Sequence, residues 1–213
     1  MTPEEKNQYL ITFNKFQQAR EREFAPKIFK ALNSQVKEAI HYIKAGVRNP
    51  TLYISSNAIV NTLRPLYLDA GVTYGAKVRA SIIKQKARMP IGFNQRMIDL
   101  MNAYFMTDIL NTSEGITEVT RELIQNVLSQ AVQDGQGIDW IVSQLQNTEV
   151  SRMRARMIAR TETVTAANQG AIFAAQDTGL TLNKEWLATN DNRTRNTHRY
   201  VNGQKIGMDD YFS

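Results

Sequence analysis

The chain has 213 residues, of which 42% are hydrophobic, and it contains no cysteine. That length and apolar content suffice for a core in one large domain or two small ones, which argues against a disordered chain. The lack of cysteine excludes disulfides, thiolate catalysis and cysteine-ligated zinc or iron–sulfur sites in this sequence. Lysine and arginine outnumber aspartate and glutamate by 26 to 20, a formal net charge of +6. The surface should therefore attract polyanions, although an ordinary soluble protein with a basic surface has the same composition.

No sequence signal indicates a membrane. No uninterrupted apolar run approaches the roughly 20 residues that a membrane-spanning helix needs. The start at Met1 lacks the basic-then-apolar pattern of a secretory signal. We therefore expect a protein that begins in the cytosol and has no membrane partner.

Helical periodicity dominates the start of the chain. From Pro3 to about Lys44, apolar residues recur at three- and four-residue steps, which predicts a long amphipathic helix that Pro26 splits or kinks. Charges of alternating sign occupy its other face. Two interpretations stay open: packing within its own domain, and partial docking on another subunit.

Two helices are expected next. A helix capped by Ser55 or Ser56 should reach Asp69 and end near Gly71, and a second should span residues 72–86. The densest basic cluster of the first half comprises Lys77, Arg79, Lys84, Lys86 and Arg88. A solvated helix end and a phosphate contact both explain that cluster.

The middle of the chain predicts three more helical segments. Residues 94–110 have helical spacing, and their methionines are expected to fill a core. Residues 117–133 follow, and their buried side is expected to hold Val119, Leu123, Ile124, Val127, Leu128 and Ala131. A glycine-rich turn and a short helix over residues 139–145 then resemble a helix-turn-helix unit. Because that short helix has no arginine or lysine, a packing corner is the favoured interpretation.

A last long helix is predicted over residues 148–175, with Gly179 just beyond its end. One face of this helix carries the arginine row Arg152, Arg156 and Arg160, spaced four residues apart. Three aligned guanidiniums suit phosphates or a row of acidic partner side chains. Pairing with neighbouring carboxylates such as Glu149 and Glu162 is the competing explanation.

The pattern changes after this helix. Residues 180–189 alternate as a strand does, and an Asn-Gly turn lies at residues 202–203 between apolar flanks. A short helical turn capped by Asn190 or Asp191 is expected between them. A small module that mixes helix and strand should therefore close the chain.

These segments predict a mainly α protein. Residues 1–147 should form an elongated multi-helix region suited to docking and assembly. Residues 148–213 should form a long helix followed by a small α+β module with a short β-hairpin.

Several short motifs follow one another in the last part of the chain. They are Arg160-Thr161-Glu162, Ala167-Asn168-Gln169-Gly170, Lys184-Glu185-Trp186, Asp191-Asn192-Arg193-Thr194-Arg195, His198 and Asn202-Gly203-Gln204. In order and approximate spacing they resemble the Mu F-like family, the minor head or head morphogenesis proteins of tailed bacteriophages. The resemblance covers residues 151–204, and upstream only the order of helices agrees. The positions that carry over are Arg160, Thr161, Glu162, Asn168, Gly170, Trp186, Asp191, Arg193, Arg195, His198 and Gly203.

The resemblance implies a virion protein of low copy number, located in the capsid interior near the portal vertex after assembly in the host cytoplasm. It implies a role in head assembly and in DNA packaging or ejection, and neither an established reaction nor a cofactor. The implied partners are the phage portal protein, capsid or scaffolding protein, and double-stranded DNA bound without sequence preference. Family members often continue to a cysteine-containing end, whereas this sequence stops at Ser213, so no metal or redox role carries over from that end.

The surface expected to contact DNA or a partner is basic. Its residues are Arg152, Arg156, Arg160, Lys77, Arg79, Lys84 and Lys86.

The sharpest enzymatic alternative is a divalent-metal site in the tail. Its candidate ligands are Asp191, His198, Asp209 and Asp210. Carboxylate and imidazole groups can hold an ion that activates water toward a phosphodiester. However, no repeated ligand spacing supports the site, and Arg193 and Arg195 add positive charge to the same turn.

A structural account uses the same residues without a metal. Asp191 should cap the turn, and Trp186 should be the buried anchor of the small module. The ion pairs expected to pin that module onto the long helix join Arg160, Arg193 or Arg195 to Glu162 or Asp191.

Three functional hypotheses follow. The leading one is a non-catalytic phage minor head protein. The second is a metal-dependent nuclease or toxin-like effector delivered with phage DNA. The third is a DNA-binding regulator, and it depends only on the helix-turn-helix-like unit.

Overall fold

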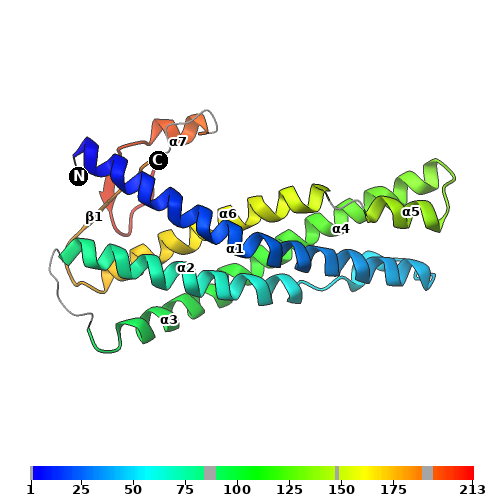
Figure 1. Ribbon diagram of the computed structural model, residues 1–213, viewed down its shortest axis with the longest axis horizontal. Coiled ribbons are helices and arrows are strands. Elements are labelled where there is room, and N and C mark those ends of the chain that lie inside the picture. Colours follow the sequence, from blue (N-terminus) through cyan, green and yellow to red (C-terminus); the bar gives the residue numbers. More distant parts are fainter. Residues whose placement is uncertain (1, 84–89, 147–148, 189–193) are drawn as a thin grey trace.

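A computed structural model describes residues 2–83, 90–146, 149–188 and 194–213. Long helices run side by side along one axis, and a small two-stranded module lies at one end of the bundle (Figure 1). The predicted fold class, mainly α with a small C-terminal α+β module, is confirmed. None of the described helices combines the length and apolar character needed to cross a membrane.

Helix α1 spans Pro3–Lys44, as predicted. It begins with a capping box, in which Thr2 Oγ1 accepts from Glu5 N at 3.2 Å and Glu5 Oε2 accepts from Thr2 N at 2.8 Å. The predicted split at Pro26 is wrong, because α1 continues through that residue. Side chains on both sides of the proline are buried in the core. Their packing outweighs the loss of one backbone hydrogen bond.

After the short helix η1, Pro50–Tyr53, helix α2 spans Asn57–Ile83 without interruption. The prediction of two helices separated at Gly71 is therefore wrong. Gly71 and Gly75 lie one turn apart and face α6, Glu149–Gln176. They allow two helix backbones to approach closely, and they do not end a helix.

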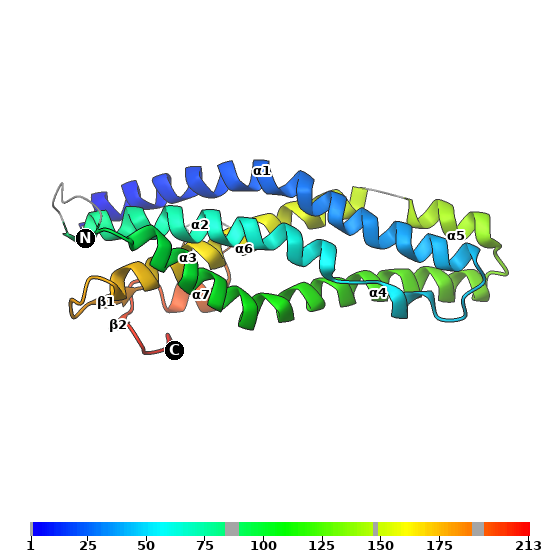
Figure 2. The same cartoon turned by 90° about the horizontal axis from the view of Figure 1, so that it is seen from below.

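The close approach is centred on Gly170 of α6. A Cβ atom at that residue would lie 2.6 Å from both the Cα and the carbonyl carbon of Gly71. A Cβ atom at Gly75 would lie 2.7 Å from the carbonyl oxygen of Gly170. Since real Cβ atoms do not tolerate such contacts, the α2–α6 packing requires these glycines. Figure 2 shows α2 and α6 lying against each other beneath α1.

Helix α3, Phe93–Tyr104, the π-helical turn η2, Phe105–Ile109, and helix α4, Leu110–Gln133, form one continuous rod. The expectation of two separate helices is wrong here, since the π turn carries the chain directly into α4 while keeping both of its end residues buried. The expected core role is confirmed for Met97 and Met101, whereas Met106 is 59% exposed. Met97 and Met101 are buried and cover the glycines of α2.

The predicted buried side of α4 is correct only in part. Ile124 and Ala131 are buried, but Val119 and Leu123 are 44% and 43% exposed. Helices α4 and α6 stand apart, with no pair of their Cα atoms within 8 Å among the described residues. The buried side of α4 also includes three residues with hydroxyl side chains, Ser113, Thr117 and Thr120.

Helix α5, Ile138–Leu145, closes the end of the bundle farthest from the two-stranded module (Figure 1). Its Ile141 packs with Ile43 of α1 and Ala131 of α4. The turn before α5 is therefore a packing corner, as the sequence favours.

The tail contains strand β1, Asn183–Glu185, helix α7, Asn196–Tyr200, and strand β2, Lys205–Gly207. The strands pair antiparallel with Lys184 opposite Ile206. The Asn-Gly turn exists, with Gly203 at a φ of 85°, but it follows α7 and does not join the strands directly. The predicted caps Asn190 and Asp191 lie outside the described residues.

Candidate functional site

The predicted arginine row lies on the outer side of α6. Met153 and Met157 lie between the three arginines and are 68% and 62% exposed. Together with Glu21 of α1, these residues line an open hollow of about 500 Å³. We call Arg152, Met153, Arg156, Met157 and Arg160 the arginine–methionine face.

The arginines of this face have few acidic neighbours. Arg160 Nε donates to Glu21 Oε2 at 3.1 Å. The guanidinium of Arg152 lies 5.4 Å from the ring centroid of Phe29, a cation–π distance. Among the residues that the structure describes, neither Arg152 nor Arg156 has a carboxylate within ion-pair distance. The face therefore carries three guanidiniums against one carboxylate.

The predicted pairing of the arginine row with Glu162 is wrong. Glu162 is two residues beyond Arg160, so the helical turn places it on the inner side of α6. There it is 8% exposed and accepts a hydrogen bond of 2.5 Å from the hydroxyl of Tyr67 on α2. The side chain of Glu149, the other expected partner, lies outside the described set.

The contact between Glu162 and Tyr67 changes the acidity of both groups. Burial raises the pKa of Glu162 above its ordinary value, and the hydrogen bond from Tyr67 opposes this only in part. Burial and the nearby Glu162 carboxylate raise the pKa of Tyr67. The pair can retain a proton inside the bundle, and it joins α2 to α6.

The family-motif residues lie in two groups. Arg160, Thr161 and Asn168 lie on the exposed side of α6, whereas Glu162 and Gly170 lie on its buried side. Trp186, Arg195, His198 and Gly203 belong to the tail module. Asp191 and Arg193 lie outside the described residues. The motif therefore marks both the packing of α6 and the construction of the tail.

The tail module is built around Trp186. Its ring meets the rings of His198 and Phe212, each edge-on with centroids 5.2 Å apart. Its backbone NH donates to the Gln204 carbonyl at 3.0 Å, and its carbonyl accepts from the Gly203 NH at 2.8 Å. Trp186 is thus the anchor that the sequence predicts, although the structure leaves it partly exposed and not fully buried.

The module is attached to the bundle differently from the prediction. Glu185 of β1 forms an ion pair with Lys6 near the start of α1. The expected pair of Arg160 with Glu162 does not form. Arg195 has no ion pair with any described residue, and the pairs expected of Arg193 and Asp191 cannot be placed. The attachment therefore runs through α1, which the sequence analysis had not connected to the tail.

The candidate metal ligands do not form a cluster in the part of the chain that the structure describes. Asp210 Oδ2 accepts from the backbone NH of Gly207 at 3.0 Å. His198 packs against Trp186. Asp191 lies outside the described residues, so its part in a metal site stays a hypothesis.

The residues of the basic cluster predicted around α2 have different surroundings in the structure. Arg79 is buried and donates to Asp177 at 3.0 Å, next to Arg96, which pairs with the same carboxylate at 2.9 Å. Lys77 lies 5.0 Å from the ring centroid of Phe16. Lys84, Lys86 and Arg88 are not described. Asp177, directly after α6, therefore ties α2 and α3 to the end of that helix through Arg79 and Arg96.

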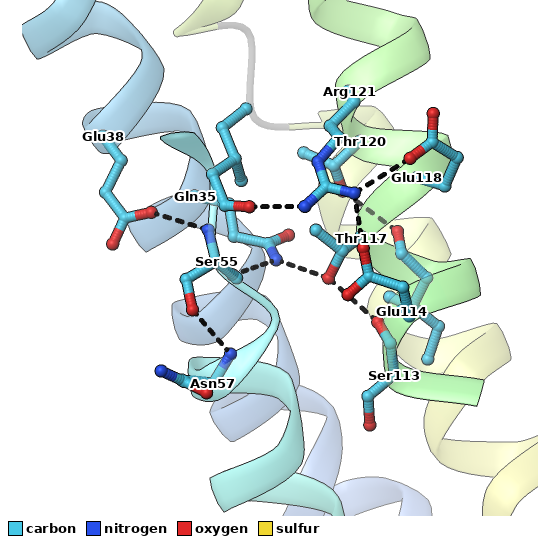
Figure 3. A network of polar contacts seen from close by, with 12 residues as sticks. Gln35, Glu38, Ser55, Asn57, Ser113, Glu114, Thr117, Glu118, Thr120 and Arg121 are labelled. Carbon is cyan, nitrogen blue, oxygen red and sulfur yellow. Dashed lines mark hydrogen bonds and ion pairs between the residues drawn. The ribbon is translucent and has the colours of Figure 1, made fainter. Parts of the chain in front are cut away.

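A polar network that the sequence analysis missed joins α1, the segment between η1 and α2, and α4 (Figure 3). The guanidinium of Arg121 contacts Glu114 at 2.5 Å and Glu118 at 2.9 Å, and it donates to the Ile54 carbonyl at 2.7 Å. The spacing of two glutamates ahead of Arg121 on one helix could have indicated this cluster.

The buried Gln35 continues this network. Its amide donates to the Ser55 carbonyl at 2.9 Å and to Thr117 Oγ1 at 2.8 Å. One turn further along α4, Arg154 of α6 donates to Thr120 Oγ1 at 2.9 Å and to the Ile116 carbonyl. Neutral acceptors thus hold Arg154 in the gap between α4 and α6.

The chain is therefore a helical bundle with an exposed arginine row, of which the described structure pairs Arg160 with a carboxylate, and a small two-stranded tail. The family described as Phage Mu protein F like protein matches residues 122–213, and this part of the chain is similar to that family. The match includes the arginine–methionine face and the whole tail module.

Two curated proteins are similar to the chain. The NAD(+)--arginine ADP-ribosyltransferase EFV of Enterococcus faecalis is 30% identical over 132 residues, which cover 59% of this chain and 27% of that protein. The minor head protein GP7 of Bacillus phage SPP1 is 32% identical over 97 residues, which cover 43% of this chain and 32% of that protein. The chain thus spans only about a quarter to a third of these relatives. No solved structure matches.

The family and the phage relative together support a protein of the phage head.

Proposed function

We propose that the chain acts as a minor head protein of a tailed phage, in the capsid interior near the portal vertex, where it aids head assembly and DNA packaging or ejection. The observation that carries this proposal is the family match over residues 122–213. The similarity to a phage minor head protein supports it.

The arginine–methionine face is the surface through which we expect the chain to act. It lies within the family-matched region, it is exposed, and most of its positive charge is not neutralised by the bundle. Charged groups in this state favour an acidic partner or packaged DNA, and they strengthen association at low salt. Portal protein is the expected partner, with capsid or scaffolding protein and double-stranded DNA as further ones.

The direct test uses the portal protein of the same phage. Binding of the purified chain to assembled portal should be measured by sedimentation at several salt concentrations. The triple substitution Arg152→Ala, Arg156→Ala and Arg160→Ala should weaken binding and flatten its salt dependence. The control removes the same charge elsewhere, through Lys37→Ala, Lys44→Ala and Arg48→Ala, all exposed positions on or after the end of α1. Absence of binding between the unaltered chain and portal would refute the portal assignment.

We also propose that the chain does not itself catalyse a reaction. In support, described groups of the tail that could do acid–base or metal chemistry make structural contacts, with His198 against Trp186 and Asp210 on a backbone NH. The ADP-ribosyltransferase name belongs to a relative of which only 27% is aligned. Two assays test this: transfer of ADP-ribose from NAD+ to arginine, and EDTA-sensitive plasmid nicking that disappears in the Asp191→Ala, His198→Ala double variant. Either activity would contradict the proposal.

A further inference from the structure

We propose that the arginine–methionine face binds an amphipathic α-helix of another head protein, one that presents Asp or Glu side chains at three- or four-residue spacing beside an apolar stripe. This inference rests on the proposed function, because it names the chemistry of the partner segment within the head. The sequence and the comparisons assign no such segment.

The shape of the face suits a helix. Its arginines and its methionines each repeat every four residues along α6, which corresponds to a rise of about 6 Å between neighbours. The side chains of a second helix lying along α6 repeat at the same interval. Carboxylates one turn apart on that helix can therefore reach Arg152 and Arg156 together, while apolar residues between them cover the methionines.

The charge of the face favours an acidic partner. Among the described residues, Arg160 pairs with the carboxylate of Glu21, and no carboxylate pairs with Arg152 or Arg156. Arg154, on the next side of α6, is held by a hydroxyl and a carbonyl and likewise has no ion pair with a described residue. The bundle leaves this half of α6 with a surplus of guanidiniums, and carboxylates are their natural bidentate partners.

The two methionines distinguish a protein from DNA. Met153 and Met157 expose more than half of their surface at the centre of the hollow. Protein–DNA interfaces are strongly polar and positively charged, so two exposed thioethers in the contact contribute little to phosphate binding. Methionine and arginine are both enriched in protein–protein interfaces, and flexible methionines fit the apolar stripe of a docked helix.

The experiment places a photoreactive benzoylphenylalanine at Met157 of the full chain, which is then produced during infection by the same phage. Cross-linked peptides are identified by mass spectrometry from purified heads. The same group at Val132, which is 83% exposed on α4, serves as the positional control. A second variant carries the group at Met157 together with Arg152→Gln and Arg156→Gln. Circular dichroism checks that both variants keep the helical fold.

The expected result is a cross-link from Met157 to one helical segment of another head protein with the stated acidic and apolar pattern. The position at Val132 should not give this product, and the double arginine substitution should reduce it at least about tenfold. Cross-links to DNA, to a second copy of this chain, or to a segment without such carboxylates would overturn the proposal. So would an undiminished cross-link in the double variant, or none at all.

The outcomes separate this inference from the proposed function. A cross-link to a suitable helix in another head protein, together with no binding of the unaltered chain to portal, keeps the docking surface and refutes the portal assignment. Binding to portal without a cross-link from Met157 keeps the portal assignment and refutes the docking surface.

Discussion

The close packing of α2 on α6 can be tested by adding a single methyl group. In Gly170→Ala, the new Cβ would lie 2.6 Å from the Cα and carbonyl carbon of Gly71, and closer still to its oxygen. These are backbone atoms, so no side chain can rotate away. The two helices must separate, which loosens a contact that involves much of the buried core.

Two opposing effects determine how much Gly170→Ala changes the free energy of unfolding. Overpacking a well-filled core costs roughly 1 to 3 kcal/mol, and a backbone clash belongs at the upper end of that range. Alanine gains up to about 1 kcal/mol over glycine in a helix interior. We therefore expect Gly170→Ala to lower the free energy of unfolding by about 2 kcal/mol. Urea denaturation followed by far-ultraviolet circular dichroism measures this change.

Two matched glycines calibrate the result. Gly115 lies in α4, and a Cβ there would have no heavy atom within 4 Å, so Gly115→Ala should raise stability by about 0.5 to 1 kcal/mol. In Gly71→Ala the Cβ meets Sδ of Met101 at 2.6 Å, a flexible side chain, so the loss should be smaller than at Gly170. If Gly170→Ala were as stable as Gly115→Ala, the glycine contact would have no role in holding α2 against α6.

Three further substitutions test individual contacts. Because the pKa of Glu162 is raised, the folded chain keeps this proton to higher pH than the unfolded chain, and stability falls as pH rises above the ordinary value of 4.5. Glu162→Gln should therefore be more stable than the wild type near neutral pH and lose that advantage in acid. Urea titrations that give the variant and the wild type the same stability at neutral pH would contradict this. Trp186→Ala should destabilise the tail by about 2 kcal/mol, since the ring is only partly buried; unchanged hydrogen exchange in β1 and β2 would show that the ring is not the anchor. Thr117→Val leaves the buried amide of Gln35 without one acceptor and should cost about 1 to 2 kcal/mol in a urea titration, and a loss below 0.5 kcal/mol would contradict this role.

The helices were predictable where local signals agree with packing. The bounds of α1 follow from the capping residue Thr2, a regular apolar pattern and Gly46 beyond its end, which has a φ of 72°. The same holds for α6, which ends before Gly179 at a φ of 68°. In these segments, local preference and tertiary contacts favour the same structure.

The interpretation of Gly71 failed because glycine has two uses in helical proteins. It ends helices in the left-handed conformation, and it permits close approach of two backbones. The sequence around Gly71 does not say which applies, since the decisive neighbour, Gly170, comes from a distant part of the chain. The repeat of glycine at Gly75, one turn later, was the signal that favoured packing.

The candidate site was predicted in its positions but not in its contacts. Four-residue spacing was enough to place Arg152, Arg156 and Arg160 on one face, because that periodicity is a property of any α-helix. The carboxylate of Glu21 was not predictable, since it belongs to α1 and meets Arg160 only through tertiary packing. The exposure of the intervening methionines was missed for the same reason.

The two sides of α6 are under different physical constraints. Its inner side is filled by alanines, by Gly170 and by the buried Glu162, so almost any enlargement there moves α2 or α1. Its outer side carries the arginine–methionine face, where truncation removes little packing from the bundle. Substitutions on the inner side should therefore lower stability and every interaction together. Substitutions on the outer side should change partner binding while leaving the unfolding transition nearly unchanged. A lowered unfolding transition with unchanged binding would instead assign the arginine row to the fold.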